Sequence, residues 1–106
     1  MVPGAVAGDA PLRRAGTATW LLHELGPDFT LLVFGAAPAW ADALPLRTVA
    51  IGADGFVDVD GLATRRYDAR PGTAYLVRPD HHVCARWRRP SADSVRAALQ
   101  RACAAH

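Results

Sequence analysis

The chain has 106 residues, and its twelve arginines, without any lysine, stand against ten acidic residues, which leaves a formal net charge of +2. With 51% apolar residues at this length, the chain can build one packed core but not two domains. The surplus charge is spread along the sequence, which excludes the concentrated basic surface typical of nucleic-acid binding.

No membrane span or export signal is expected. The longest nearly apolar stretch, Phe29–Ala41, is interrupted by polar, Gly and Pro residues and falls short of the ~20 residues that a membrane-spanning helix needs. Met1–Gly4 lack the basic and apolar regions of a signal peptide. Cys84 and Cys103 are too few for a disulfide framework and are interpreted as small buried residues in a reducing cytosol. The expected location is the cytoplasm.

The first third of the chain is predicted to contain one helix and one strand. Residues 1–16 are rich in Gly, Ala and Pro and are predicted to form a linker or extended arm, followed by a domain over 17–106. A helix is predicted from Thr17 to Leu25, because leucines recur on one face and Gly26-Pro27 follows as a stop signal. Phe29–Phe34 is apolar on both faces, which is typical of a central strand.

The middle third is predicted to complete a βαβ unit. A short helix over Ala39–Leu44 precedes a strand over Arg47–Ile51, and such a crossover makes the two strands parallel. Asp54-Gly55 is predicted to turn. Residues 56–59 are interpreted as a short strand or loop, and residues 60–67 as a helical turn capped by the first of them, an aspartate.

The last third predicts a hairpin and a helix. Thr73–Val77 and His82–Trp87 are rich in β-forming residues, and the Arg-Pro-Asp-His sequence between them suits a type I turn. Ser91 is a good N-cap for an amphipathic helix that packs on the hairpin, with apolar residues at helical spacing: Val95, Ala98, Leu99, Ala102 and Cys103. The order of these predicted helices and strands along the chain predicts an α/β, thioredoxin-like fold, in which βαβ and ββα halves share one mixed central sheet flanked by helices.

Two segments resemble a known family. Residues 75–88, which read YLVRPDHHVCARWR, resemble the LVRPDG-aromatic-VAWR hairpin of flavin-dependent aromatic hydroxylases, the phenol and 3-hydroxyphenylpropionate hydroxylase-like monooxygenases. Pro3-Gly4, Ala10-Pro11 and residues 20–34 are similar to the PG, AP and LLG.gFTLL.F elements of the same domain. His81 departs from the pattern, because it stands where the family usually has glycine.

The resemblance implies a C-terminal thioredoxin-like domain without a redox cysteine pair. It implies that the parent monooxygenase uses FAD and NAD(P)H to insert one oxygen atom of O₂ into a phenolic substrate. The implied partners are the upstream FAD-binding and substrate domains, with a second subunit as a further option. This chain lacks the G-x-G-x-x-G turn that a flavin pyrophosphate needs, and Gly8-Asp9-Ala10, similar to the start of the second flavin motif, runs into Pro11. No cofactor-binding residue is predicted here.

No catalytic or metal-binding residue is predicted either. Thioredoxin-fold oxidoreductases carry C-x-x-C after the first core strand, where this chain has Ala36–Ala39. His81, His82 and Cys84 are too few for a structural zinc site, which takes four ligands. Arginines 86, 88 and 89 around Trp87 are interpreted as the solvated face of an edge strand rather than a phosphate site.

The predicted function is structural packing or subunit contact within a FAD-dependent monooxygenase. Trp20, Trp40 and Trp87 are expected to be core or interface anchors, and an exposed one would indicate contact with the missing domains. One alternative is a stand-alone thioredoxin- or peroxiredoxin-like binding module that lacks redox cysteines. Another is a thiol enzyme that uses Cys84.

Overall fold

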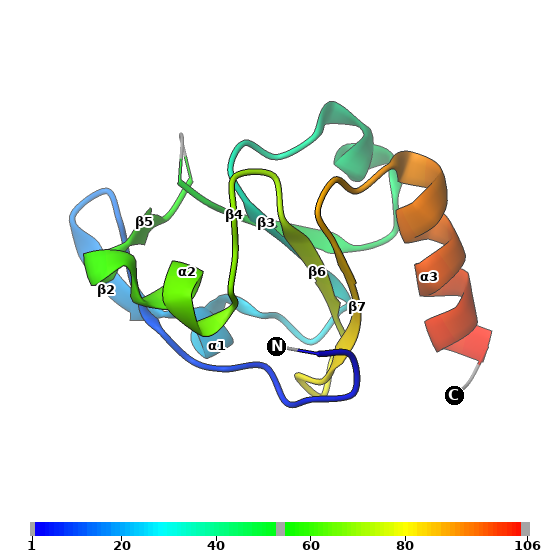
Figure 1. The fold of residues 1–106 in the computed structure, drawn as a ribbon, viewed down its shortest axis with the longest axis horizontal. Helices are drawn as coiled ribbons and strands as arrows, with labels where there is room; N and C mark the ends of the chain where they lie inside the picture. The colour runs from blue at the N-terminus through cyan, green and yellow to red at the C-terminus, as the bar shows by residue number, and fades with distance from the viewer. Residues whose placement is uncertain (1, 53–54, 105–106) are drawn as a thin grey trace.

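The computed structural model describes residues 2–52 and 55–104, and these residues form a main sheet and a smaller sheet (Figure 1). The main sheet has the strand order β4-β3-β6-β7, with β3 at Thr30–Phe34, β4 at Arg47–Ile51, β6 at Ala74–Val77 and β7 at Val83–Trp87. Strand β3 pairs parallel with β4 and antiparallel with β6, and β6 pairs antiparallel with β7. The sheet is therefore mixed, as predicted.

The helical elements complete both predicted halves. The 3-10 helix η1, Ala39–Ala43, connects β3 to β4, and the helix α3, Ala92–Ala104, follows the β6–β7 hairpin. The hydroxyl of Ser91 accepts a hydrogen bond from the Ser94 N–H at 3.1 Å, which confirms the predicted cap of α3. The βαβ and ββα halves thus form a thioredoxin-like fold.

The predicted turn of the hairpin is present and adopts unusual backbone geometry at its end. The His81 N–H donates to the Arg78 carbonyl at 2.8 Å, which closes a four-residue turn. His81 itself has φ +67°, in the left-handed region that favours glycine. The family's usual glycine at this position therefore has a physical reason, and histidine occupies a conformation that costs free energy.

The predicted helix over 17–25 is wrong in its first half. Thr17–Trp20 is strand β2, which pairs antiparallel with β1, Pro11–Arg14, and only Leu21–Glu24 is helical, as α1. Thr17, Thr19 and Trp20 favour a strand once a partner strand is available. Strand β1 lies within the predicted arm, where the sequence indicated no regular structure.

The prediction that Asp60 caps a helical turn over residues 60–67 is also wrong. Val57–Asp58 is the short strand β5, which pairs antiparallel with β1 and completes the smaller sheet in the order β2-β1-β5. Helix α2 spans Leu62–Arg66. The Asp58 carboxylate, not Asp60, accepts the N–H groups of Ala63 and Thr64 at 2.8 and 2.9 Å. Asp60 instead has φ +54°, outside helical geometry. The predicted turn at Asp54-Gly55 falls partly outside the described residues.

The main sheet is covered on both faces, because side chains along β3 alternate between two clusters. Leu32 and Phe34 face the side of the smaller sheet, where they pack with Tyr67 and Tyr75, while Leu31 and Val33 face the side of η1 and α3. Figure 1 shows α3 on one side of the main sheet and the smaller sheet with α1 and α2 on the other. All five residues of β3 are buried, as the prediction of a central strand required.

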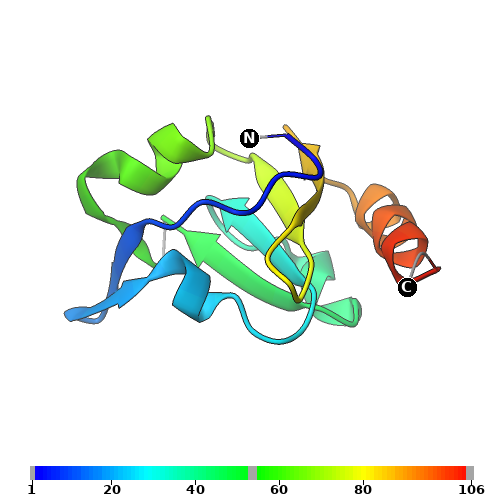
Figure 2. The ribbon, with the colours of Figure 1, turned by 90° about the horizontal axis from the view of Figure 1, so that it is seen from below.

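The N-terminal segment runs along the free edge of β7. The Gly4 N–H donates to the Val83 carbonyl at 2.7 Å, the Val83 N–H donates to the Ala5 carbonyl at 2.8 Å, and the Ala7 N–H donates to the His81 carbonyl at 2.7 Å. Figure 2 shows this dark-blue segment passing beside the hairpin. It covers backbone groups that an edge strand would otherwise expose. None of the helices described is long and apolar enough to cross a membrane.

Candidate functional site

The loop after β3 occupies the position at which redox-active thioredoxin-fold proteins carry their cysteines. Here it reads Ala36-Ala37-Pro38-Ala39, beside a cavity of about 420 Å³ whose polar lining includes Arg14, Asp42 and Thr48. The Arg14 guanidinium lies 5.1 Å from the centroid of the Phe56 ring, which also lines the cavity. This lining offers a carboxylate, a hydroxyl and a guanidinium but no thiol, so it cannot perform disulfide exchange.

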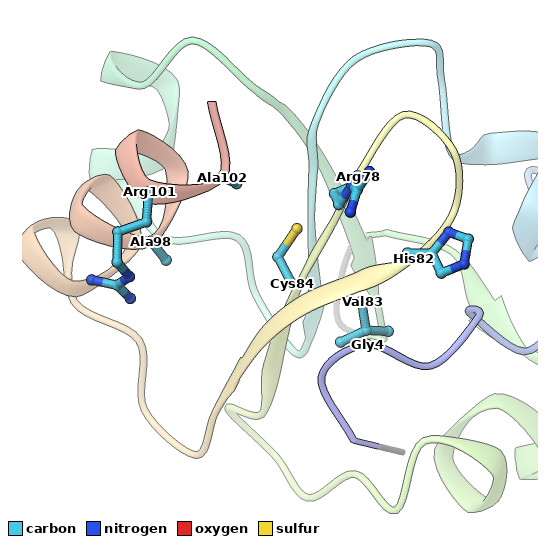
Figure 3. Close-up of a pocket in the computed structure, with 8 residues that line it drawn as sticks. All are labelled: Gly4, Arg78, His82, Val83, Cys84, Ala98, Arg101 and Ala102. Carbon is cyan, nitrogen blue, oxygen red and sulfur yellow. The ribbon is translucent and has the colours of Figure 1, made fainter. Parts of the chain in front are cut away.

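The two cysteines lie apart from that loop, and both are free. Cys84 is half-buried in β7 and lines a second cavity together with Arg78, His82 and Arg101. Figure 3 shows its Sγ pointing to the space between α3 and Arg78. Burial raises the pKa of the Cys84 thiol, with Arg78 lowering it to a smaller extent. Cys103 is exposed on α3, so the interpretation of both cysteines as buried residues is wrong for Cys103.

We expect Cys84 to react with a maleimide more slowly in the folded chain than in the same chain unfolded in urea, at neutral pH. The raised pKa lowers the thiolate fraction at a given pH, and thiolate is the reactive form. Time-resolved alkylation followed by peptide mass spectrometry measures this rate at each cysteine. A folded-state rate at Cys84 above its unfolded-state rate would contradict the prediction and would favour the thiol enzyme.

The three histidines that the structure describes do not cluster with other metal ligands. His81 and His82 are half-buried at the hairpin, and His23 is exposed on α1. Within residues 2–52 and 55–104, no three His, Cys, Asp or Glu side chains approach closely enough to hold a metal ion. The Nδ1 atom of His82 lies 3.3 Å from a carboxylate oxygen of Asp80, and Asp80 also pairs with Arg78 at 2.9 Å.

The arginines near the end of the hairpin divide into two kinds. Arg86 is held by the protein: its guanidinium donates to the Asp68 carbonyl at 2.7 Å and lies 5.6 Å from the centroid of the Tyr75 ring. Arg88 and Arg89 are exposed, while Trp87 packs against two clusters of the core. Arg86 therefore has partners within the fold, whereas the side chains of Arg88 and Arg89 are exposed to solvent.

The smaller sheet has one face whose side chains are mostly exposed among the residues that the structure describes. The register pairs Pro11 with Trp20, and Arg13 with both Ala18 and Val57, so these five side chains share one face, which we call the outer face. Their neighbour in the sequence, Leu12, points to the other face and is fully buried. Trp20 is 55% exposed and Val57 is 57% exposed. Of the three tryptophans, Trp20 is therefore the one expected to contact another domain.

Sequence reasoning missed the outer face, although a signal for it exists. Strands β1 and β2 are joined by Ala15-Gly16, and both residues have positive φ, at +50° and +78°. A two-residue loop with both φ values positive is typical of a tight β-hairpin, and glycine at its second position favours that conformation. The sequence between Pro11 and Trp20 therefore contained a hairpin signal.

The residues similar to the start of a flavin motif are hydrogen-bonded within the fold. The Asp9 carboxylate accepts the N–H groups of Ala10 and Leu22 at 2.9 and 3.0 Å, so it caps helix α1. The Gly8 carbonyl accepts the Tyr67 hydroxyl at 2.6 Å. Both groups are thus used to join the N-terminal segment to the core, and the glycine-rich turn that a pyrophosphate needs is missing from the sequence.

Solved structures place the chain in the thioredoxin-like class. The thioredoxin domain of a thiol-disulfide oxidoreductase from Bacteroides vulgatus superposes with a TM-score of 0.67 at 13% identity, over 92% of this chain and 97% of that one. PrxQ of Xylella fastidiosa superposes with a TM-score of 0.69 at 13% identity, over 97% of this chain and 98% of that one. At this level of identity the likeness concerns the fold alone.

The sequence identifies the family. Residues 1–105 match the family described as aromatic-ring hydroxylase, C-terminal, and the chain belongs to it. Aklavinone-11 hydroxylase, solved with FAD and aklavinone, is similar with a TM-score of 0.79 and 25% identity, over 93% of this chain and 21% of that one. The flavin-dependent monooxygenase PieE, solved with FAD and substrate, has a TM-score of 0.71 and 30% identity, over 82% of this chain and 17% of that one. Among curated proteins there is no significant match.

The chain therefore spans about a fifth of the length of these two hydroxylases. The family resemblance seen in residues 75–88 and 20–34 is confirmed, as is the thioredoxin-like fold.

Proposed function

We propose that this chain is the non-catalytic C-terminal domain of a FAD-dependent aromatic-ring monooxygenase, and that its role is to pack against the catalytic domains or a second subunit. The observation that carries the proposal is the family match over residues 1–105 together with the small share of each hydroxylase that the chain covers. The thiol-free loop at Ala36–Ala39 supports a scaffold whose redox position is not used for electron transfer.

The proposed chemistry of the parent protein lies outside this chain. FAD and NAD(P)H would serve the upstream domains, where one oxygen atom of O₂ is inserted into a phenolic substrate. Asp9 and Gly8, which are similar to the start of a flavin motif, are hydrogen-bonded within the fold, and this supports a flavin site in the upstream domains. We propose residues 1–16 as an extended arm that lies over the domain at 17–106 and pairs with it through β1. We propose the cytoplasm as the location, because the free cysteines suit a reducing compartment.

The test uses the full-length protein, encoded by the reading frame that contains this chain and the proposed upstream domains. We expect that protein to bind FAD and to oxidise NAD(P)H in the presence of a phenol, with formation of the hydroxylated product. A Cys84→Ser/Cys103→Ser variant is expected to retain this activity, because neither thiol takes part. Product analysis by mass spectrometry and the flavin absorbance of the purified protein are the measurements.

Three results would overturn the proposal. A full-length protein without flavin, or a gene that encodes this domain alone, would support the stand-alone binding module, which the family match does not favour. Disulfide reductase activity that is lost in the Cys84→Ser variant would support the thiol enzyme.

A further inference from the structure

The outer face of the smaller sheet combines features of an interface in one place. Its five side chains, Pro11, Arg13, Ala18, Trp20 and Val57, are mostly apolar, and Trp20 and Val57 are more than half exposed. Tryptophan and arginine are the residue types enriched at the energetic centres of interfaces. The opposite face of the same sheet, by contrast, contributes the fully buried Leu12 to the core.

The charge on this face comes from Arg13, for which no ion-pair partner lies within the described part of the chain. Arg13 is exposed and lies on the central strand of the sheet, opposite Ala18 on one side and Val57 on the other. Among the residues that the structure describes, Arg13 has no ion pair, whereas Arg47, Arg78, Arg86 and Arg96 each have one. When a guanidinium in the middle of an apolar face is covered by another surface, a carboxylate on that surface is the complementary partner.

We propose that the outer face is the docking surface for the upstream catalytic region of the same polypeptide, which presents an apolar patch with a carboxylate opposite Arg13. This inference rests on the proposed function. The chain spans about a fifth of the similar hydroxylases, so a covalently linked region several times larger is the nearest occupant. An apolar face that includes a charged side chain is typical of contacts between domains of one chain, which are more polar than obligate interfaces.

A second copy of this chain fits the face less well. Two-fold contact between identical faces places each patch against itself. Because Arg13 lies on the central strand, such contact would bring two guanidinium groups together without a carboxylate from the same face to neutralise them. Like charges at a contact oppose binding, so charge favours the intrachain partner.

Two matched valines provide the test. Val57, on the outer face, and Val6, on the N-terminal segment, are 57% and 61% exposed. Val57→Cys and Val6→Cys are introduced separately into the full-length protein, and maleimide labelling at each position is followed by peptide mass spectrometry. We expect the Val57→Cys variant to be labelled more slowly than the Val6→Cys variant, by about tenfold or more, because a docked interface excludes water from its centre. The protection is expected to be independent of protein concentration.

Charge reversal gives an independent readout. Arg13→Glu, added to the Val57→Cys variant, is expected to restore labelling by about tenfold, because it places two carboxylates opposite each other. Arg88→Glu, an exposed arginine on another surface, is the matched control and should leave labelling slow.

The outcomes separate this inference from the proposed function. Equal labelling of the two variants in a protein that binds FAD and hydroxylates a phenol would overturn the docking surface alone. Protection that disappears on dilution would assign the face to a second copy and would also overturn it. Absence of flavin and of phenol-dependent NAD(P)H oxidation in the unmodified protein would overturn the proposed function, whatever the labelling.

Discussion

Tyr67→Ala is expected to destabilise the folded chain by about 3–5 kcal/mol, because truncating a large buried aromatic side chain leaves a cavity. The Tyr67 ring is fully buried, with its centroid 5.7 Å from that of Phe34 and 5.1 Å from that of Tyr75. Its hydroxyl donates to the Gly8 carbonyl at 2.6 Å, and its own carbonyl accepts the Tyr75 hydroxyl. Tyr67 thus joins the main sheet, α2 and the N-terminal segment.

Urea unfolding measures this loss, and Tyr67→Phe is the matched control. The phenylalanine keeps the ring contacts and removes only the hydrogen bond to Gly8, so we expect a loss of about 1 kcal/mol. Equal losses in the two variants would show that the ring packing contributes little, which would contradict the prediction.

The same tyrosine gives the stability a pH dependence. Burial raises the pKa of Tyr67, with smaller contributions from Asp9 and Tyr75, so the unfolded chain releases the phenolic proton at lower pH than the folded chain does. The stabilisation is therefore fully present below the unfolded-state pKa of about 10 and falls as pH rises above it. Tyr67→Phe should reduce the slope of unfolding free energy against pH in that alkaline range.

Leu76→Ala is expected to destabilise the chain by about 3 kcal/mol, through the loss of buried methyl groups and the cavity that remains. Leu76 is fully buried in β6 and packs with Ala98 and Leu99 of α3, on the face of the sheet opposite Tyr67. Helix α3 follows the last strand and packs through this cluster. In the Leu76→Ala variant, the amides of α3 should therefore also exchange faster with solvent than the amides of β3.

The control for Leu76→Ala is Val57→Ala, which removes methyl groups from an exposed position. We expect that variant to change the unfolding free energy by less than about 0.5 kcal/mol. Urea unfolding gives both values, and hydrogen exchange followed by mass spectrometry reports on α3. A Leu76→Ala variant as stable as Val57→Ala would show that α3 does not depend on this contact.

Local patterns in the sequence were sufficient for most of the main sheet. Phe29–Phe34 predicted the buried β3, the Arg-Pro-Asp-His turn predicted the β6–β7 hairpin, and Ser91 predicted the start of α3. Each of these signals lies within a few neighbouring residues, where steric preference and a short hydrogen bond decide the conformation. The family was also identified at this level, because its motifs are contiguous stretches of sequence.

The tertiary structure decided the features that depend on partners distant in sequence. Strand β1 pairs with β5, more than forty residues away along the chain, and this long-range pairing holds the β1–β2 hairpin, with Thr17–Trp20 as a strand, in a sheet. Asp9 caps α1 across 13 residues, which no local capping pattern shows.

The sequence by itself thus determined the fold class, the family and the absence of a thiol after the first core strand. Only the tertiary structure decided which tryptophan is exposed and that Trp20, Arg13 and Val57 share one face. The physical reason is that exposure depends on which elements cover a side chain, and strand register depends on long-range pairing that local residue preferences do not specify.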